Sequence, residues 1–190
     1  NEWIDSHTVN ITGTISVLDA AKSVNPEQPV PVVYASSSAV YGDNDQLPLS
    51  ETAQPAPLSA YAADKYGCEL HARVAGLIHN IPTLGLRFFN VYGSRQDPSS
   101  PYSGVISIFL KQIQSGEAIT IQGDGEQSRD FIFVLDVVRY LIKGMKHVSS
   151  KAPVFNVCTG MRSPINELAN TLNQVCGTKN DIHHVDPRPG

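Results

Sequence analysis

The 190-residue sequence predicts an α/β fold with a largely parallel sheet. Segments with the periodicity of amphipathic helices alternate with short apolar runs rich in β-branched residues, which is the order expected of consecutive β-α-β units. Apolar residues make up 41% of the chain and charged residues 17%, a balance typical of globular rather than disordered proteins. A chain of this length buries roughly 70% of the surface that its unfolded form exposes, so a core needs no disulfide or metal.

Two long helices and two buried strands are expected in the first half of the chain. The opening EWIDSHTVNITGTISVLDAAKS predicts a helix over 3–23, which the breaker NPEQP ends. The run VPVVYASSS predicts a buried parallel strand. After a Pro-rich connection a helical pattern covers about 59–79, and PTLGLRFFNVYG predicts a second buried strand.

The second half continues the alternation. GVISIFLKQIQSGE and LDVVRYLIKGMKH predict helices, AITIQG and PVFNVCTG predict strands, and SRDFIFV predicts an extended piece after a turn at Gly123-Asp124-Gly125. The last helix, SPINELANTLNQVCG, is expected to start with Ser163 as N-cap and Pro164 at its first position, and to end at Gly177.

Ligands of parallel α/β sheets bind at the carboxyl ends of the strands. This rule selects three segments, SSSAVYG, NVYG and CTG, each of which follows an expected strand.

The segment LSAYAADKYGCE places Tyr61 and Lys65 four residues apart, on one face of the expected helix. A free tyrosine has a pKa of about 10, and a neighbouring positive charge lowers it. Such a tyrosine can exchange a proton with a substrate hydroxyl, and a serine of SSS can relay it. The same spacing also occurs in helices that have no catalytic role, so the pair alone leaves both interpretations open.

Composition argues against several function classes. The net charge is −4 without a basic block, so neither nucleic acid nor an anionic membrane surface is indicated. No apolar run approaches about 18 residues and no signal peptide opens the chain, which predicts a cytoplasmic protein. Cys68, Cys158 and Cys176 form no C-x-x-C motif and are expected to be buried, reduced thiols. His183, His184 and Asp186 are interpreted as solvated surface, and no metal is expected.

Seven motifs in a fixed order resemble the extended short-chain dehydrogenase/reductase family, and within it the NAD-dependent nucleotide-sugar epimerase/dehydratase branch that includes UDP-glucose and UDP-N-acetylglucosamine 4-epimerases. They are VNITGTISVLDAA, YASSSAVYGD, LSAYAADK, LRFFNVYG, GDGEQSRDFIFVLDVV, VFNVCTG and DPRPG. The resemblance implies the C-terminal part of a Rossmann-like doubly wound parallel sheet plus a small substrate-binding α/β region. Residues 1–93 would form the second half of the NAD-binding domain, and residues 94–190 would mostly bind substrate, with 129–160 partly returning to the first domain.

The resemblance also implies roles for individual residues. Tyr61 would be the catalytic acid/base, Lys65 would lower its pKa and hold the nicotinamide ribose, and Ser37 would relay the proton. The remaining residues implied in NAD binding are Asn10, Ala35, Ser36, Phe88 and Phe89, and those implied in nucleotide-sugar binding are Ser38, Asn90, Arg129 and Arg188. Guanidinium groups suit the two arginines to a diphosphate.

Four polar residues near these motifs also have structural interpretations. Arg87 can be a purely structural ion-pair residue, and Asn156 is expected to satisfy loop backbone. Tyr41 and Tyr92 are expected to pack rather than catalyse.

A 4-epimerase acting on a UDP-hexose or UDP-N-acetylhexosamine is the first expectation, through oxidation at C4 and reduction on the opposite face. Family dehydratases carry an Asp-Glu pair where this chain has Ser38 and Ala39, and decarboxylases usually keep the Glu. Alanine cannot transfer a proton, so Ala39 argues against dehydration and decarboxylation. The nucleotide-sugar 4,6-dehydratase and the UDP-glucuronate decarboxylase or epimerase are therefore alternatives to the first expectation.

A non-catalytic fragment or pseudo-enzyme with a structural role is the alternative of another class. The family's G-x-x-G-x-x-G turn, whose helix N-terminus holds the NAD pyrophosphate, does not occur in the 190 residues. The expectation is that about the first third of the protein lies outside this sequence and that the sequence alone has little activity. A homodimer through the helices at 3–23 and 59–79 is also implied by the resemblance.

Overall fold

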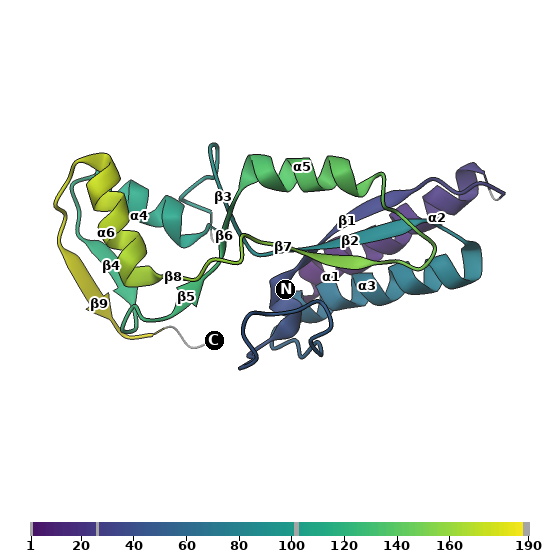
Figure 1. The fold of residues 1–190 in the computed structure, drawn as a ribbon, viewed down its shortest axis with the longest axis horizontal. Helices are drawn as coiled ribbons and strands as arrows, with labels where there is room; N and C mark the ends of the chain where they lie inside the picture. The colour runs from purple at the N-terminus through teal and green to yellow at the C-terminus, as the bar shows by residue number, and fades with distance from the viewer. Residues whose placement is uncertain (1, 26, 101–102, 188–190) are drawn as a thin grey trace. The chain divides into compact units, whose positions relative to one another are not determined.

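The computed structural model describes residues 2–25, 27–100 and 103–187, so Arg188 lies outside the described residues. The chain divides into two compact units (Figure 1), unit 1 with Asn1–Phe89 and Asp136–Val157, and unit 2 with Asn90–Leu135 and Cys158–Gly190. Helices alternate with strands in both units, and three of the four sheets are parallel, which confirms the α/β prediction. The functional assignment of the two parts of the chain stays a prediction.

Unit 1 is built on a parallel sheet with the strand order β1-β2-β7. Its strands are β1 (Val32–Ser37), β2 (Thr83–Phe88) and β7 (Val154–Val157). Ser37 pairs with Phe88, which pairs with Val157, so the three carboxyl ends lie abreast as the ligand-edge prediction requires.

Helices cover both faces of this sheet (Figure 1). Helix α3 (Ala60–His79) packs on one face, and α5 (Val134–Gly144) lies on the other, where Gly144 approaches Leu84 and Val33. The Ser59 hydroxyl accepts a hydrogen bond from Ala62 N at the start of α3, and Asn80 ends it in the left-handed conformation. Along α3 lie α1 (Glu2–His7) and α2 (Gly13–Val24).

The expected helix at 3–23 is confirmed, with one local change. A π-helical segment, η1 (Thr8–Thr12), joins α1 to α2 and carries Asn10. Single π-helical turns inside longer helices are rare and frequently lie at functional sites.

Unit 2 consists of short strand pairs and two helices, α4 (Val105–Gln114) and α6 (Ile165–Cys176). The parallel pairs are β3 (Asn90–Tyr92) with β6 (Phe131–Phe133) and β4 (Ile119–Gln122) with β9 (Ile182–Val185). The antiparallel pair is β5 (Ser128–Arg129) with β8 (Ser163–Pro164). The buried core between α4, α6 and β4 consists of Phe109, Ile113, Ile119, Ile121, Ile165 and Ala169.

Two boundary predictions were wrong. PTLGLRFFNVYG forms two strands, because Phe89 donates its backbone N–H to Val157 O in unit 1 while Asn90 donates its own to Asp130 O in unit 2. Ser163 does not cap α6, because it stays extended and pairs with Arg129. The first helical N–H groups, of Ile165 and Asn166, instead donate to the backbone carbonyls of Gln127 and Gly125, so no side-chain cap is needed. The predicted end of α6 at Gly177, in the left-handed conformation, is confirmed.

Two smaller observations concern the thiols and the helices. Cys68 is buried, but Cys176 is exposed at the end of α6, so the prediction of buried thiols was wrong for Cys176. Within the described ranges, no helix has both the length and the apolar character needed to cross a bilayer.

Two glycines of α3 provide a test of how tightly this helix packs. A Cβ at Gly76 would overlap the backbone oxygen of Ser150, whereas a Cβ at Gly67 would meet only the Ile11 side chain, with its terminal methyl nearest. Both changes to alanine favour the helix by up to about 1 kcal/mol. We expect Gly76→Ala to lower the free energy of unfolding by about 1–3 kcal/mol through overpacking, and Gly67→Ala to leave it nearly unchanged. Urea denaturation measures both, and equal effects of the two changes would contradict the close helix–loop contact at Gly76.

Candidate active site

Tyr61 and Lys65 lie together on the first turns of α3. The Lys65 ammonium is 5.9 Å from the centre of the Tyr61 ring and donates a hydrogen bond of 3.1 Å to Ala35 O in β1. Tyr61 is 45% exposed, so a ligand can reach its phenol. The side chain of Lys65 therefore bridges the helix to the carboxyl end of the first strand.

Ser37 lies at that strand end, at the point where β1 turns into the short 3-10 helix η2 (Ser38–Tyr41). Its hydroxyl oxygen accepts a hydrogen bond of 3.2 Å from Ala39 N, which leaves the O–H free to donate to a ligand. Ser38, the first residue of η2, is half-buried. The serine triplet is thus held at the ligand edge of the sheet.

Ser36 differs from its two neighbours. It is 2% exposed, and its hydroxyl donates a 2.5 Å hydrogen bond to Glu69 of α3. Because successive strand residues point to opposite faces, Ser36 and Ser37 cannot present their hydroxyls to the same side. Any contact of Ser36 with a cofactor would have to come from its backbone.

The other residues expected to bind NAD lie in three places in unit 1. Asn10 lies in η1, and its amide donates to Ser6 O at 3.0 Å. Ala35 is exposed in β1, and its carbonyl holds Lys65. Phe88 ends β2, and Phe89 follows it, both half-buried. Their contact with a cofactor stays a prediction.

The residues expected to bind the nucleotide-sugar in unit 2 are separated along its strands. Asn90 donates its amide to Asp130 O at 3.2 Å and lines a pocket of about 200 Å³ together with Tyr92, Gln96, Val105 and Phe131. Arg129 is exposed, and its guanidinium donates to Ser128 O at 2.8 Å. Arg188 lies outside the described residues.

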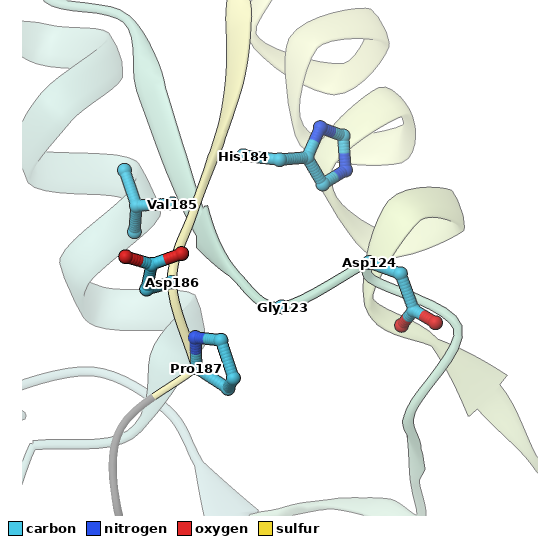
Figure 2. A pocket seen from close by; sticks show the side chains of 6 residues that line it. All are labelled: Gly123, Asp124, His184, Val185, Asp186 and Pro187. Carbon is cyan, nitrogen blue, oxygen red and sulfur yellow. The ribbon is translucent and has the colours of Figure 1, made fainter.

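A second, more open pocket of about 630 Å³ lies at the turn after β4 (Figure 2). Figure 2 shows the His184 ring and the Val185 side chain on opposite sides of β9, and the His184 Nε2 lies 3.0 Å from the Asn166 side-chain oxygen. In the part of the chain that the structure describes, no three His, Cys, Asp or Glu side chains gather as metal ligands would.

The structural interpretation of Arg87 is confirmed. Its guanidinium forms a two-pronged ion pair with Glu69, at 2.8 Å from Nε to Oε1 and 2.7 Å from Nη2 to Oε2, and both side chains are 6% exposed. Burial works to lower the pKa of Arg87, but the hydrogen bonds to Glu69 and Tyr41 outweigh it, so this pKa lies above its ordinary value. Arg87 therefore stays charged under all working conditions.

Asn156 and Tyr41 also have the structural roles expected of them. Asn156 donates its amide to Leu49 O at 3.0 Å, which holds the loop after η2. Tyr41 is fully buried, and its hydroxyl accepts from Arg87 and donates to Asn156 Oδ1, both at 2.7 Å. The ring of Tyr92 packs against Phe133, with 5.6 Å between ring centres.

Glu69 is the residue that the sequence interpretation missed. A signal for it existed, because Arg87 lies inside an apolar strand and a buried guanidinium requires a carboxylate partner. The residue four positions after Lys65, on the helical face that bears Tyr61, is a carboxylate.

Comparison with known proteins gives a consistent result. Residues 3–158 match the NAD dependent epimerase/dehydratase family. The structure of UDP-N-acetylglucosamine 4-epimerase from Methanobrevibacter ruminantium M1 superimposes with a TM-score of 0.90 at 38% identity over 96% of this chain. UDP-glucose 4-epimerase from Thermotoga maritima superimposes with a TM-score of 0.92 at 32% identity over the whole chain.

Among curated sequences, UDP-glucuronate 4-epimerase 6 of Arabidopsis thaliana is 36% identical over 200 residues and covers 95% of this chain. The chain spans 57% and 60% of the two solved chains and 42% of the Arabidopsis protein. The three similar proteins are 4-epimerases by name, and their names give three different sugars.

Two tyrosines with buried hydroxyls, Tyr41 of η2 and Tyr34 of β1, test the hydrogen-bond network around Arg87. Tyr41→Phe would remove the buried hydrogen bonds that the Tyr41 hydroxyl makes with Arg87 Nη1 and Asn156 Oδ1, so we expect the free energy of unfolding to fall by about 1–3 kcal/mol. Tyr34 is the matched control, because its buried hydroxyl has no hydrogen-bond partner among the described residues. Burial, and then the charge of Glu69, raise the pKa of Tyr34, so the hydroxyl remains neutral. Tyr34→Phe should leave stability unchanged or raise it, and urea denaturation showing the reverse order would contradict the network.

Proposed function

Because this chain belongs to the NAD-dependent epimerase/dehydratase family, we propose that the whole protein is a nucleotide-sugar 4-epimerase that uses NAD. The observation that carries the proposal is the placement of Tyr61 beside Lys65, with Lys65 bonded to the strand end that bears Ser37. In the proposed reaction the sugar is oxidised at C4 to a 4-keto sugar, and the hydride then returns to the opposite face.

Each catalytic side chain has a defined task. Tyr61 takes the proton of the sugar hydroxyl as the hydride leaves C4, and returns a proton when the hydride comes back. Lys65 holds its positive charge beside the Tyr61 ring and is proposed to bind the nicotinamide ribose. Ser37 donates its hydroxyl hydrogen to the sugar oxygen or passes a proton between sugar and Tyr61.

The residues near Tyr61 fit the nicotinamide end of NAD. An ammonium has three donors, and Ala35 O is the one hydrogen-bond acceptor of Lys65 among the described residues, so two donors are available for ribose hydroxyls. When bound, NAD supplies the hydride acceptor. Asn10, Ala35, Phe88 and Phe89 are proposed to contact the cofactor. The G-x-x-G-x-x-G turn that holds the pyrophosphate does not occur in these 190 residues.

The nucleotide-sugar is proposed to contact Ser38, Asn90, Arg129 and Arg188. Ala39 argues for epimerisation, because it replaces the acidic residue that dehydration and decarboxylation require. UDP-glucose, UDP-N-acetylglucosamine and UDP-glucuronate are all candidate substrates, since similar proteins are named for each of them.

The proposal extends to architecture. Unit 1 would be part of the Rossmann-like NAD-binding sheet, and unit 2 part of the substrate-binding region. A homodimer is proposed through α3, on which Leu70, Val74, Leu77 and Ile78 form an apolar face that is 46–72% exposed in this chain.

Replacement of the catalytic tyrosine tests the reaction. In the protein expressed from its complete reading frame, Tyr61→Phe removes the proton acceptor, so we expect kcat to fall by about 100-fold or more. Tyr66→Phe on the same helix is the control and should leave kcat unchanged. Epimer formation from the three candidate UDP-sugars is followed by NMR.

Activity of Tyr61→Phe equal to wild type would exclude this mechanism. If the wild-type protein makes no epimer from any of the three sugars, the non-catalytic alternative becomes the better account.

A charged residue on the apolar face of α3 tests the dimer. Leu77→Lys places a charge among exposed apolar side chains, so we expect the molar mass measured by light scattering to fall from that of two chains to one. Val175→Lys, on α6 of unit 2 and 77% exposed, is the control and should not change it. A Leu77→Lys variant that stays dimeric would place the interface elsewhere.

A further inference from the structure

Three residues lie in a row on α3. Tyr61, Lys65 and Glu69 are spaced by four residues, so their side chains leave the same face of the helix on successive turns. Lys65 binds Ala35 O, and Glu69 binds the hydroxyl of Ser36. The helix is therefore attached to two consecutive residues of β1, directly before Ser37.

Glu69 is fixed in turn by β2. Its two carboxylate oxygens accept hydrogen bonds from Arg87 Nε and Nη2, and Oε1 also accepts one from the Ser36 hydroxyl. The remaining Arg87 nitrogen, Nη1, donates to the Tyr41 hydroxyl in η2. One buried group thus ties together the helix, two strands and the turn that follows the serine triplet.

A contribution to stability does not by itself explain why Glu69 and Arg87 are charged and buried. Both charges are desolvated, and a buried ion pair often contributes no more to stability than apolar side chains of similar size. What the pair provides is a fixed orientation, because a guanidinium donates two parallel N–H bonds to a carboxylate in one plane and at one distance. A sliding or rotation of α3 on β1 would break several of these bonds together.

We propose that Glu69 and Arg87 are positioning residues that hold Tyr61 and Lys65 of α3 in register with Ser37 of β1. The group of Ser36, Tyr41, Glu69 and Arg87 is called the Glu69 clamp here. The inference rests on the proposed catalytic roles of Tyr61, Lys65 and Ser37. The buried pair of Glu69 and Arg87, one helical turn after Lys65, would thereby set the distance between the Tyr61 phenol and the Ser37 hydroxyl.

Kinetics of three variants of the full-length protein separate positioning from stability. Glu69→Gln keeps the shape but removes the charge, and we expect kcat to fall by about 10- to 100-fold with little change in KM, because a small misplacement of reacting groups costs this much. The double variant Glu69→Met and Arg87→Met removes both charges and should fold at least as well as Glu69→Gln, yet it should have the same low kcat. Ile81→Ala is the stability control. Ile81 is 1% exposed in a cluster with Leu18, Ala21 and Ala75, apart from the clamp, so this variant should lose stability but keep kcat.

Amide hydrogen exchange tests the clamp without any turnover. Exchange at residues 35–39 should accelerate at least about tenfold in Glu69→Gln and in the double variant, but not in Ile81→Ala, because local opening follows the loss of local contacts. If the wild-type protein makes no epimer while exchange shows this pattern, the proposed function fails and the clamp stands. Wild-type kcat in the double variant, or unchanged exchange at residues 35–39, would overturn the clamp.

Discussion

The buried ion pair between Glu69 and Arg87 is the interaction on which the arrangement of unit 1 depends. Arg87 lies inside β2, and its charge persists at all working pH values, so the fold must provide a carboxylate at that depth. Helix α3 provides it, and this requirement fixes which face of α3 meets the sheet. The same face carries Lys65 and Tyr61, so the orientation demanded by a buried charge also orients the candidate catalytic groups.

Parallel strand pairing determines where those groups meet. Ser37, Phe88 and Val157 lie abreast, so the chain leaves the sheet three times at the same edge. At this edge η2 starts directly after Ser37, and its Tyr41 returns into the core to bind Arg87. The end of β1 is therefore fixed through Ala35 and Ser36, which bind Lys65 and Glu69, while the Ser37 hydroxyl hydrogen remains available to a ligand.

The sequence predicted the elements of the fold well, because each long helix has a helical periodicity and each buried strand is a short apolar run between breakers. It failed where distant partners decide the local structure. Ser163 has the sequence of an N-cap, but pairing with Arg129 keeps it extended, and carbonyls of the turn at 125–127 take over the capping. The strand β9 was not predicted either, because IHHV has too little apolar character without its partner β4.

In the candidate site, too, local pattern predicts some features and distant contacts decide others. The four-residue spacing predicted that Tyr61 and Lys65 share one helical face, and the structure brings the two side chains together. The direction of Ser36, by contrast, depends on Glu69 lying opposite it, and a contact between residues 33 positions apart cannot be obtained from local pattern. Asn90 and Arg129 belong to unit 2, where their own contacts are known but their contact with a sugar is a proposal.

In the proposed reaction, hydrogen leaves C4 of a nucleotide-sugar and returns to the same carbon. The most direct measurement uses UDP-glucose, UDP-N-acetylglucosamine and UDP-glucuronate carrying deuterium at C4, incubated with the full-length protein in ordinary water and followed by NMR. We expect at least one sugar to be converted to its 4-epimer with the deuterium retained at C4. An epimer with hydrogen from solvent at C4 would contradict the proposed reaction, because the hydrogen would then have left as a proton.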